Sequence, residues 1–357
     1  MLKIIRETAG LLTAWYLKEK REMPWRSDPS PYHVYVSEIM LQQTRVDTVR
    51  PYYERFIREL PDVQALADCG EDRLFKLWEG LGYYSRVRNM QKAARVIMAE
   101  YGGIIPSSCE ELMKLPGIGS YTAGAVASIA YHEKEPVVDG NVLRVITRLS
   151  GSRENIDLDK TKKTMREELK RFLADFEGDP AVYNQSLMEL GALVCIPNGA
   201  PLCASCPLRE HCRAHLQDLT GEIPVRLPKR SRKIMEKTVF LVFRGDSLLF
   251  TKNREKKLLS GLYALPEAEG FLSEAEASAF LEDMGFGALQ LKRLPDAVHV
   301  FTHVEWRMRA YEVLTESVLP EEESEDAPLR RFVTPRELEE TAAVPEAYRK
   351  WPFRIGG

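Results

Sequence analysis

The sequence lacks the features that would place the chain in a membrane or outside the cell. No apolar run reaches the length that a membrane-spanning helix requires. The N-terminus, Met1-Leu2-Lys3-Ile4-Ile5-Arg6, has neither the apolar core nor the cleavage site of a signal peptide. We therefore expect a cytoplasmic protein with no membrane partner, in which structural disulfides are disfavoured.

An excess of one charge sign is also missing. The chain has 50 Lys and Arg residues against 53 Asp and Glu residues, which gives a formal net charge of -3. The total charge does not indicate a nucleic-acid-binding protein, so such a role has to rest on local patches. Internal repeats and low-complexity tracts are absent as well. With 357 residues and 44% hydrophobic content, the sequence predicts a globular protein of about two domains.

The cysteines, six in all, are informative because disulfides are not expected. Four of them follow a C-x7-C-x2-C-x5-C pattern at Cys195, Cys203, Cys206 and Cys212. Short, unequal spacers of this kind wrap one compact centre, and four thiolates suit either a tetrahedral zinc ion or an iron–sulfur cluster. The spacing therefore predicts a metal centre within residues 195–212.

The stretch from Leu115 to Asp139 contains a tight turn followed by a helix. Pro116 and Gly117 favour a turn, Gly119 keeps the backbone bare, and the small-residue helix is expected to begin near Ser120. Such a turn leaves backbone N–H groups pointing outward at a helix N-terminus, where they suit a phosphate. An ordinary packing corner between two helices is the alternative.

Glu38 is the first unusual acid. In a helix expected from Val34 to Val49, it falls on the apolar face, where a carboxylate needs a partner or becomes a neutral acid. A neutral acid near pH 7 can donate a proton, whereas an ion pair with Arg45 is the simpler reading. The polar run Gln42-Gln43-Thr44 follows, with groups that suit base edges or the gap left by a displaced base.

Three further segments allow both a structural and a functional reading. Trp25 and Arg26 are either a packed aromatic beside a surface charge or a ligand contact. The Gly-rich loop before Arg86 combines tyrosines with arginines, which suits a base-stack wedge with phosphate contacts as well as a plain helix junction. Asp139 precedes a helix expected over 141–149, where an N-cap is the commonest role.

The composition changes after Leu216. Residues 217–235 read as a basic linker, with Arg226, Lys229, Arg230, Arg232 and Lys233 in its second half, that either follows a phosphate backbone or is a solvated tether. From residue 236 the pattern is α+β. We expect a hairpin over 238–251, a helix that opens with the capping box Ser273/Glu276, and strands over 298–301 and 306–314.

Together, these segments resemble the helix-hairpin-helix DNA glycosylases, and most closely the adenine DNA glycosylases of the MutY type. The resemblance covers nearly the whole chain. It is carried by Ser37-Glu-Ile-Met-Leu-Gln-Gln-Thr44, Glu79-Gly-Leu-Gly-Tyr-Tyr-Ser-Arg86, Leu115-Pro-Gly-Ile-Gly119, Val138-Asp-Gly-Asn-Val142, the cysteine pattern and Phe301-Thr-His303.

The resemblance implies a multidomain fold. Residues 1–216 would form an all-α helix-hairpin-helix glycosylase domain with a [4Fe-4S] cluster on the cysteines at 195–212, and residues 236–357 an α+β Nudix-like domain that recognises 8-oxoguanine. The implied partner is double-stranded DNA with adenine:8-oxoguanine mispairs, bound by a monomeric, nucleoid-associated enzyme. The implied reaction is hydrolysis of the N-glycosidic bond of adenine opposite 8-oxoguanine or guanine in base excision repair.

The resemblance also implies site residues. Glu38 would protonate adenine, Asp139 would stabilise or capture the oxocarbenium-like sugar, and Asn141 would orient Asp139. Bifunctional relatives of the endonuclease III type carry a Schiff-base lysine where this chain has Tyr121, so we predict a monofunctional glycosylase. The expected DNA contacts are Arg26, Leu41, Gln43, Thr44, Leu81, Tyr83, Arg86, Gly117, Gly119, Phe301, Thr302 and His303.

The Nudix-like domain itself is expected to lack pyrophosphatase activity. A Nudix box needs several carboxylates on one helix face for Mg²⁺, but Ala275, Ala279 and Phe280 stand where the box has an arginine and two glutamates. Two alternative functions remain at this point. One is an endonuclease III-like glycosylase/lyase, and the other is a non-enzymatic, zinc-stabilised DNA-binding protein.

Overall fold

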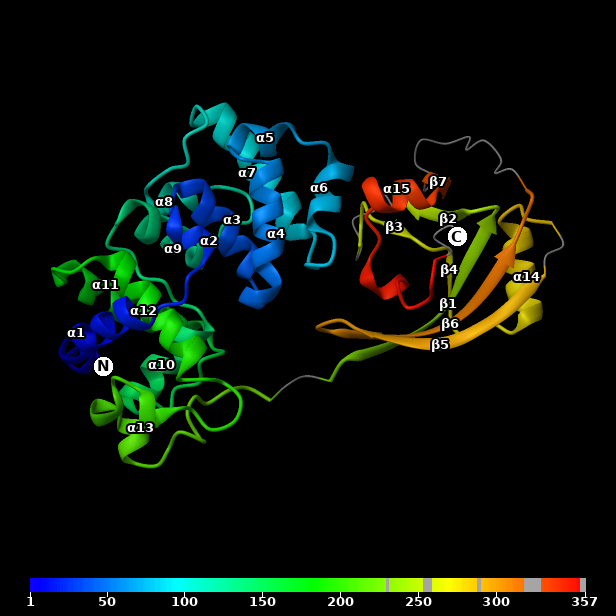
Figure 1. The fold of residues 1–357 in the computed structure, drawn as a ribbon. Coiled ribbons are helices and arrows are strands. Elements are labelled where there is room, and N and C mark those ends of the chain that lie inside the picture. The colour runs from blue at the N-terminus through cyan, green and yellow to red at the C-terminus, as the bar shows by residue number, and fades with distance from the viewer. Residues whose placement is uncertain (229–230, 253–258, 288–289, 318–328, 354–357) are drawn as a thin grey trace. The chain divides into compact units, whose positions relative to one another are not determined.

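The computed structural model describes residues 1–228, 231–252, 259–287, 290–317 and 329–353. The chain divides into two compact units (Figure 1). Unit 1 consists of Met1–Asp68 and Ser85–Pro228, and unit 2 of Cys69–Tyr84 and Lys229–Gly357. The described residues 217–228 of the expected linker therefore pack with unit 1, whereas Lys229 and Arg230 lie outside the described residues.

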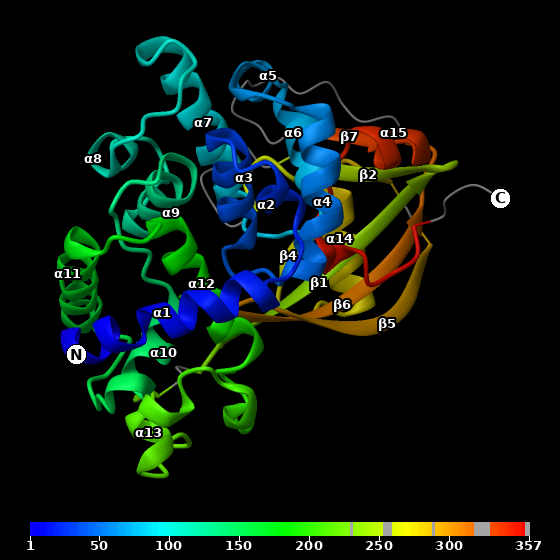
Figure 2. The same ribbon diagram turned by 60° about the vertical axis from the view of Figure 1, so that its left-hand side comes forward.

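Unit 1 is helical. Its helices are α1 (Leu2–Glu19), α2 (Pro24–Ser27), α3 (Pro31–Leu41), α4 (Val46–Glu59), α5 (Val63–Asp68), α7 (Ser85–Glu100), α8 (Cys109–Leu112), α9 (Ser120–Tyr131), α10 (Gly140–Ser150), α11 (Asp159–Asp175), α12 (Pro180–Leu193) and α13 (Arg213–Leu216), with 3-10 turns at Cys203–Ser205 and Arg209–His211. One buried core joins α1, α10, α11 and α12, which lie side by side in Figure 2. None of the described helices combines the length and apolarity that a membrane crossing requires.

The continuous helix expected from Val34 to Val49 is wrong. Helix α3 ends at Leu41 and α4 begins at Val46. Between them Gln43 adopts a left-handed φ of 58°, which an α-helix cannot contain. The polar run thus forms a turn instead of a helix face, and this turn exposes backbone and side chains at the end of α3.

The hairpin and the next helix start are confirmed. Gly117 has a φ of 76°, and a Cβ on it would lie 2.6 Å from the Asn89 Cβ, so both conformation and space require glycine here. Helix α9 begins at Ser120. Helix α10 begins at Gly140, and its N-cap is Asp139, whose side chain accepts a hydrogen bond from Val142 N.

In its described residues, unit 2 is built on a mixed sheet of seven strands in the order β3-β2-β1-β6-β5, with β4 paired to β1 and β7 to β2. The strands are β1 (Lys233–Arg244), β2 (Ser247–Lys252), β3 (Tyr263–Ala264), β4 (Glu267–Glu269), β5 (Leu291–Val300), β6 (Val304–Leu314) and β7 (Leu329–Val333). Its helices are α6 (Glu71–Trp78), α14 (Glu274–Asp283), α15 (Pro335–Glu340) and a 3-10 turn, η3 (Glu346–Tyr348).

The sheet carries a hydrophobic core on each face. Side chains of α14, such as Leu281, pack against Phe240 and Val242 of β1 on one face. Leu338 of α15 and Tyr348 of η3 belong to the core on the other face, and Figure 1 shows α14 and α15 on opposite faces. The hairpin β1–β2, the capping box of α14 and strand β6 confirm the predicted elements. Strand β5 is also confirmed but begins at Leu291, earlier than expected, whereas β3, β4, β7 and α15 were not predicted.

Candidate active site

A single cavity of about 530 Å³ in unit 1 contains most of the residues expected to carry chemistry. Helices α3, α9 and α12 and the N-terminus of α10 contribute its walls, together with the segment from Lys20 to Pro29. Its volume is in the range typical of small-molecule sites. Glu38, Tyr121, Asp139 and Asn141 all line it, so the two acids that the sequence singled out converge on one cavity.

Glu38 is buried, with 6% of its surface exposed, and its partner is Tyr121, not Arg45. The Tyr121 hydroxyl donates a hydrogen bond of 2.6 Å to Glu38 Oε2. Burial raises the pKa of Glu38 to about 7, and the charge of Asp139 raises it too, while the Tyr121 hydrogen bond and Arg26 act in the opposite direction. A substantial fraction of Glu38 is therefore protonated near neutral pH, as a general acid requires.

Asp139 is held by donors from two directions. Val142 N donates to Oδ1 at 2.8 Å, and Asn141 Nδ2 donates to Oδ2 at 2.6 Å. Burial raises the pKa of Asp139 above its usual value, but these hydrogen bonds lower it again in part because they favour the charged form. Asp139 is therefore both the N-cap of α10 and a residue of the cavity. Arg144 Nη2 in turn donates to Asn141 Oδ1 at 2.8 Å and fixes the amide.

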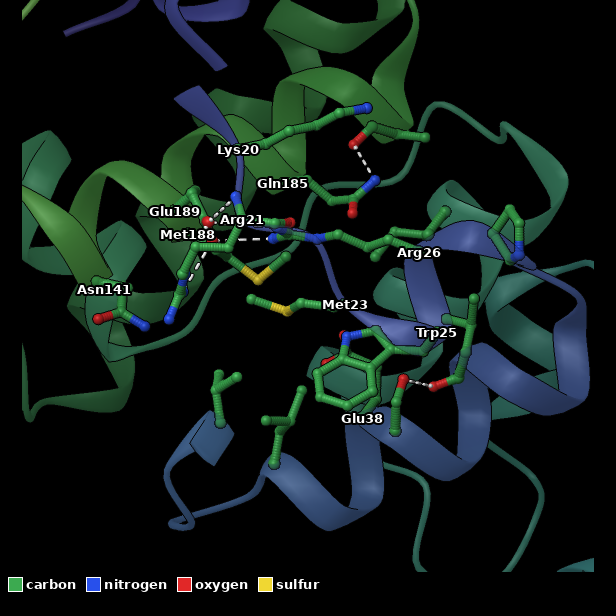
Figure 3. A pocket seen from close by; sticks show the side chains of 18 of the residues that line it. Lys20, Arg21, Met23, Trp25, Arg26, Glu38, Asn141, Gln185, Met188 and Glu189 are labelled. Atoms are coloured by element: carbon green, nitrogen blue, oxygen red, sulfur yellow. Dashed lines mark hydrogen bonds and ion pairs between the residues drawn. The ribbon is translucent and has the colours of Figure 1, made fainter. Parts of the chain in front are cut away.

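Glu189 is a cavity residue that the sequence analysis missed. It lies on α12 between buried leucines and is 1% exposed. Arg21 and Arg26 both bind its carboxylate, as the dashed lines in Figure 3 show. Although burial alone raises the pKa of Glu189, the hydrogen bonds from both arginines lower it to about 2. An acid on an apolar helix face, the signal that identified Glu38, was also present here.

Arg26 and its neighbour Trp25 are therefore site residues, not surface groups. Arg26 donates to Glu189 Oε2 at 2.9 Å, and Trp25, which is buried, lines the same cavity beside Glu38 (Figure 3). The cavity thus combines a protonatable acid, a fixed anion paired with cations, and an aromatic wall. A flat, polar ring system such as a purine suits this combination, because its edges hydrogen-bond and its faces stack.

The turn after α3 is held from the side by Arg86. Its Nη1 atom donates to the carbonyl oxygens of Ile39, Met40 and Gln42 at 2.8, 3.0 and 2.7 Å. A cation at a helix C-terminus satisfies carbonyl groups that have no partner in the helix. Arg86 therefore supports the turn that carries Leu41 and Thr44, both of which line the cavity, and Gln43, which is exposed.

The other expected DNA contacts lie outside the cavity. Gly117 and Gly119 form the turn before α9. In unit 2, Leu81 is buried, and Tyr83 is exposed with a left-handed φ of 48°. The Tyr83 hydroxyl is hydrogen-bonded to the Thr302 hydroxyl, so two expected DNA-reading segments meet. Phe301 is half-buried, whereas Thr302 and His303 are exposed in the turn between β5 and β6.

The four cysteines lie on one segment at the end of unit 1, and three of them, Cys195, Cys206 and Cys212, pack against its core. Buried Arg148 donates to Cys195 Sγ at 3.4 Å and to Ile196 O at 3.1 Å. Among the described residues, no three His, Cys, Asp or Glu side chains form a ready-made site for a single metal ion.

The chain is similar to known DNA repair proteins over most of its length. Residues 36–174 match the HhH-GPD superfamily of base excision DNA repair proteins, and residues 238–351 match the NUDIX domain. The mouse adenine DNA glycosylase is 34% identical over 84% of this chain and 69% of its own length. The human adenine DNA glycosylase is 34% identical over 97% of this chain and 73% of its own. The chain belongs to the adenine DNA glycosylase family. It is accordingly a DNA N-glycosylase of base excision repair.

Solved structures place the fold of this glycosylase in the same superfamily. A thermostable thymine-DNA glycosylase is 26% identical and superposes with a TM-score of 0.55 over 60% of this chain and 98% of its own. Endonuclease III in a non-covalent DNA complex gives a TM-score of 0.53 at 23% identity, over 61% of this chain and 98% of its own, and shows the fold alone.

Proposed function

We propose that this glycosylase removes adenine mispaired with 8-oxoguanine, or with guanine, by hydrolysis of the N-glycosidic bond. The observation that carries the proposal is the convergence of Glu38 and Asp139 on one cavity, with a pKa near 7 for the first and a fully hydrogen-bonded carboxylate for the second. Two acids with different environments can divide the work of glycosidic cleavage.

Each acid then has a separate task. Protonated Glu38 donates its proton to N7 of adenine, which makes the base a neutral leaving group as the C1′–N9 bond breaks. Asp139 remains ionised, held by Asn141 and the backbone of α10, and stabilises the positive charge that develops on the sugar. Water then adds to C1′ and its proton returns to solvent, which leaves an abasic site and free adenine.

The duplex hides both reaction faces, so the adenine has to leave the stack and enter the cavity. Gln43 and Tyr83, each in a strained left-handed conformation, are placed on turns that suit insertion into the vacated space. The backbone N–H groups after Gly117 suit a phosphate. Arg86 supports the Gln43 turn from within the protein instead of meeting a phosphate itself.

The direct test is release of free adenine from a duplex that contains one adenine:8-oxoguanine pair. Release of adenine, but not of thymine or of oxidised pyrimidines from matched duplexes, is the expected result. A pyrimidine-damage glycosylase/lyase would show the reverse preference, and a purely structural DNA-binding protein would release no base. We also propose that the enzyme is a nucleoid-associated monomer, and sedimentation of the free enzyme and of its DNA complex would check the monomeric state.

The presence of Tyr121 in place of a lysine predicts that the enzyme does not cleave the DNA strand. A phenol cannot form an imine with the abasic sugar, so we expect the pure enzyme to release adenine and leave the strand intact until alkali is added. Tyr121→Lys places an amine in the same cavity and is expected to yield a covalent product with DNA after borohydride reduction. Strand cleavage by the unmodified enzyme at the rate of base release would contradict the monofunctional assignment.

A substitution at His303 tests how the enzyme selects the base opposite adenine. We propose that the segment Phe301-Thr302-His303, called the reading turn, recognises 8-oxoguanine, because its two polar side chains are exposed at the tip of β5 and β6. His303→Ala is expected to lower the ratio of kcat/KM for adenine opposite 8-oxoguanine to that opposite guanine by about tenfold. His215→Ala, an exposed histidine of α13 in unit 1, is the control, and equal losses on both substrates would contradict the role.

We further propose that Cys195, Cys203, Cys206 and Cys212 hold a [4Fe-4S] cluster. The donor set fits, since four thiols on one segment suit an iron–sulfur cluster and Arg148 already donates to one sulfur. The cluster, when bound, would cross-link the loops of residues 195–212 to the core of unit 1. A brown protein with about four irons and four sulfides per chain is expected, whereas a colourless, zinc-loaded protein would favour zinc.

A further inference from the structure

Lys237 occupies a position where the sheet of unit 2 should bury an apolar side chain. Successive residues of β1 point to opposite faces, and Val239, Leu241 and Phe243 enter the core beneath α15. Lys237 points to the same face as these residues and is only 8% exposed. An unpaired lysine at such a place is costly, so its surroundings have to compensate.

The ammonium group of Lys237 has two partners. It is ion-paired with Glu267 of β4, and it lies 3.8 Å from the ring centroid of Trp306 of β6. The second oxygen of the Glu267 carboxylate accepts a hydrogen bond of 2.8 Å from the hydroxyl of Tyr348, which is 1% exposed. These four side chains, Lys237, Glu267, Trp306 and Tyr348, form a connected group that we call the lysine cluster.

Trp306 connects the lysine cluster to the reading turn. Its ring packs edge-on against Phe301, with ring centroids 4.8 Å apart, and Phe301 packs in turn against His299 at 4.5 Å. Trp306 is buried, and its indole N–H has no hydrogen-bond partner among the described residues. The orientation of the indole therefore depends on ring contacts, of which the Lys237 cation is one.

We propose that the lysine cluster positions the reading turn, and so sets the preference of the enzyme for the base opposite adenine. Lys237 holds the face of Trp306, Trp306 holds Phe301, and Phe301 N closes the turn by donating to Val304 O at 2.8 Å. Lys237 is a positioning residue in this arrangement, since it is buried and its ammonium group is engaged by Glu267 and Trp306. The inference rests on the proposed role of the reading turn.

A buried ion pair is a weak source of stability, because hydrophobic residues of similar volume often serve as well or better. The energetic gain of the pair therefore does not explain why a lysine and a glutamate occupy this core. A requirement for fixed geometry explains the two charged residues, because an ion pair, a hydrogen bond and a cation–ring contact each restrict direction as well as distance. The position of the reading turn is restricted in the same way, because Trp306 packs against Phe301.

The test compares three variants of the full-length enzyme. Lys237→Met removes the cation over Trp306 and leaves Glu267 with only the Tyr348 hydrogen bond, so we expect the 8-oxoguanine-over-guanine ratio of kcat/KM to fall about fivefold. The double variant Lys237→Met/Glu267→Met removes both charges and is expected to recover the melting temperature without recovering the ratio. Lys237→Arg keeps a cation over Trp306 and is expected to retain the ratio. Cleavage of adenine opposite guanine should change less than twofold in all three.

Two controls separate positioning from general destabilisation. Leu281→Ala weakens the core on the opposite face of the sheet and should lower the melting temperature while the ratio is unchanged. Lys292→Met removes an exposed lysine of β5 and should change neither. Hydrogen exchange of the peptide from His299 to Glu305 should be faster in Lys237→Met and in the double variant than in the unmodified enzyme.

The outcomes distinguish this inference from the proposed function. If the unmodified enzyme has no preference for 8-oxoguanine, or if His303→Ala keeps that preference, the role of the reading turn is wrong. If His303→Ala lowers the ratio but the double Met variant keeps it, with unchanged exchange of the turn, the lysine cluster is structural only and the inference is overturned. Loss of the ratio in Leu281→Ala would overturn it as well.

Discussion

Replacing Asp139 with asparagine is expected to reduce the single-turnover rate of adenine release by about a thousandfold. The substitution removes the negative charge that faces the developing cation. It keeps the helix cap, because an asparagine oxygen can accept the hydrogen bond from Val142 N as the carboxylate does. The melting temperature should therefore change by no more than a few degrees, so that the loss of rate can be assigned to charge.

The chain offers a matched control at Asp179. This residue also lines the cavity and caps a helix, α12, by accepting a hydrogen bond of 2.8 Å from Ala181 N. Asp179→Asn is expected to keep the rate within about twofold of the unmodified enzyme, because the Asp179 carboxylate is 40% exposed and already contacts His132 Nδ1 at 3.0 Å, so solvent screens its charge. A similar loss in both variants would show that cavity charge in general, and not Asp139, drives the reaction.

Glu38→Gln is expected to reduce adenine release by about a thousandfold, because the amide has the shape of the acid but cannot donate its proton to the base. The unmodified enzyme should lose activity as the pH rises through about 7, the pKa of Glu38. Tyr121→Phe removes a hydrogen bond that favours the carboxylate, so the alkaline limb should move to higher pH. An unchanged rate in Glu38→Gln would exclude Glu38 as the acid.

The same pKa predicts how stability depends on pH. The folded-state pKa of Glu38, about 7, lies above the unfolded value of 4.5, so its contribution to stability is complete below pH 4.5 and is lost as the pH rises through 7. Such a shift corresponds to about 3 kcal/mol. The melting temperature of Glu38→Gln should therefore be compared with that of the unmodified enzyme at the same pH. The substitution should stabilise the protein more at pH 8 than at pH 4. Equal effects at both pH values would contradict the shift.

The turn after α3 illustrates where local sequence was insufficient. The apolar spacing around Glu38 placed its side chain correctly on the buried face, but the helix was extended over Gln43, whose left-handed φ ends it. What stabilises that end is Arg86, which lies 44 residues away along the chain from Gln42. A contact between residues so far apart leaves no periodic pattern in the sequence. From the sequence alone, Arg86 could equally have contacted a phosphate.

The lysine in β1 illustrates the same limit in unit 2. Strand alternation predicts the face to which Lys237 points, but not that Glu267, Trp306 and Tyr348 from three other elements surround it. The Nudix-type helix shows the opposite case. The replacement of the expected arginine and two glutamates by Ala275, Ala279 and Phe280 can be read directly, because a missing functional group needs no tertiary context.

Features that depend on local chemistry could be read from the residues alone: the glycines of the hairpin, the acid on an apolar face, the cap at Asp139, the cysteine spacing and the alternating strands. The folded chain was needed to show that Tyr121 is the partner of Glu38, that two arginines hold Glu189, and that Arg86 stabilises the end of α3. The physical reason is that a pKa or a binding site depends on burial and on partners distant in sequence, which local patterns do not specify.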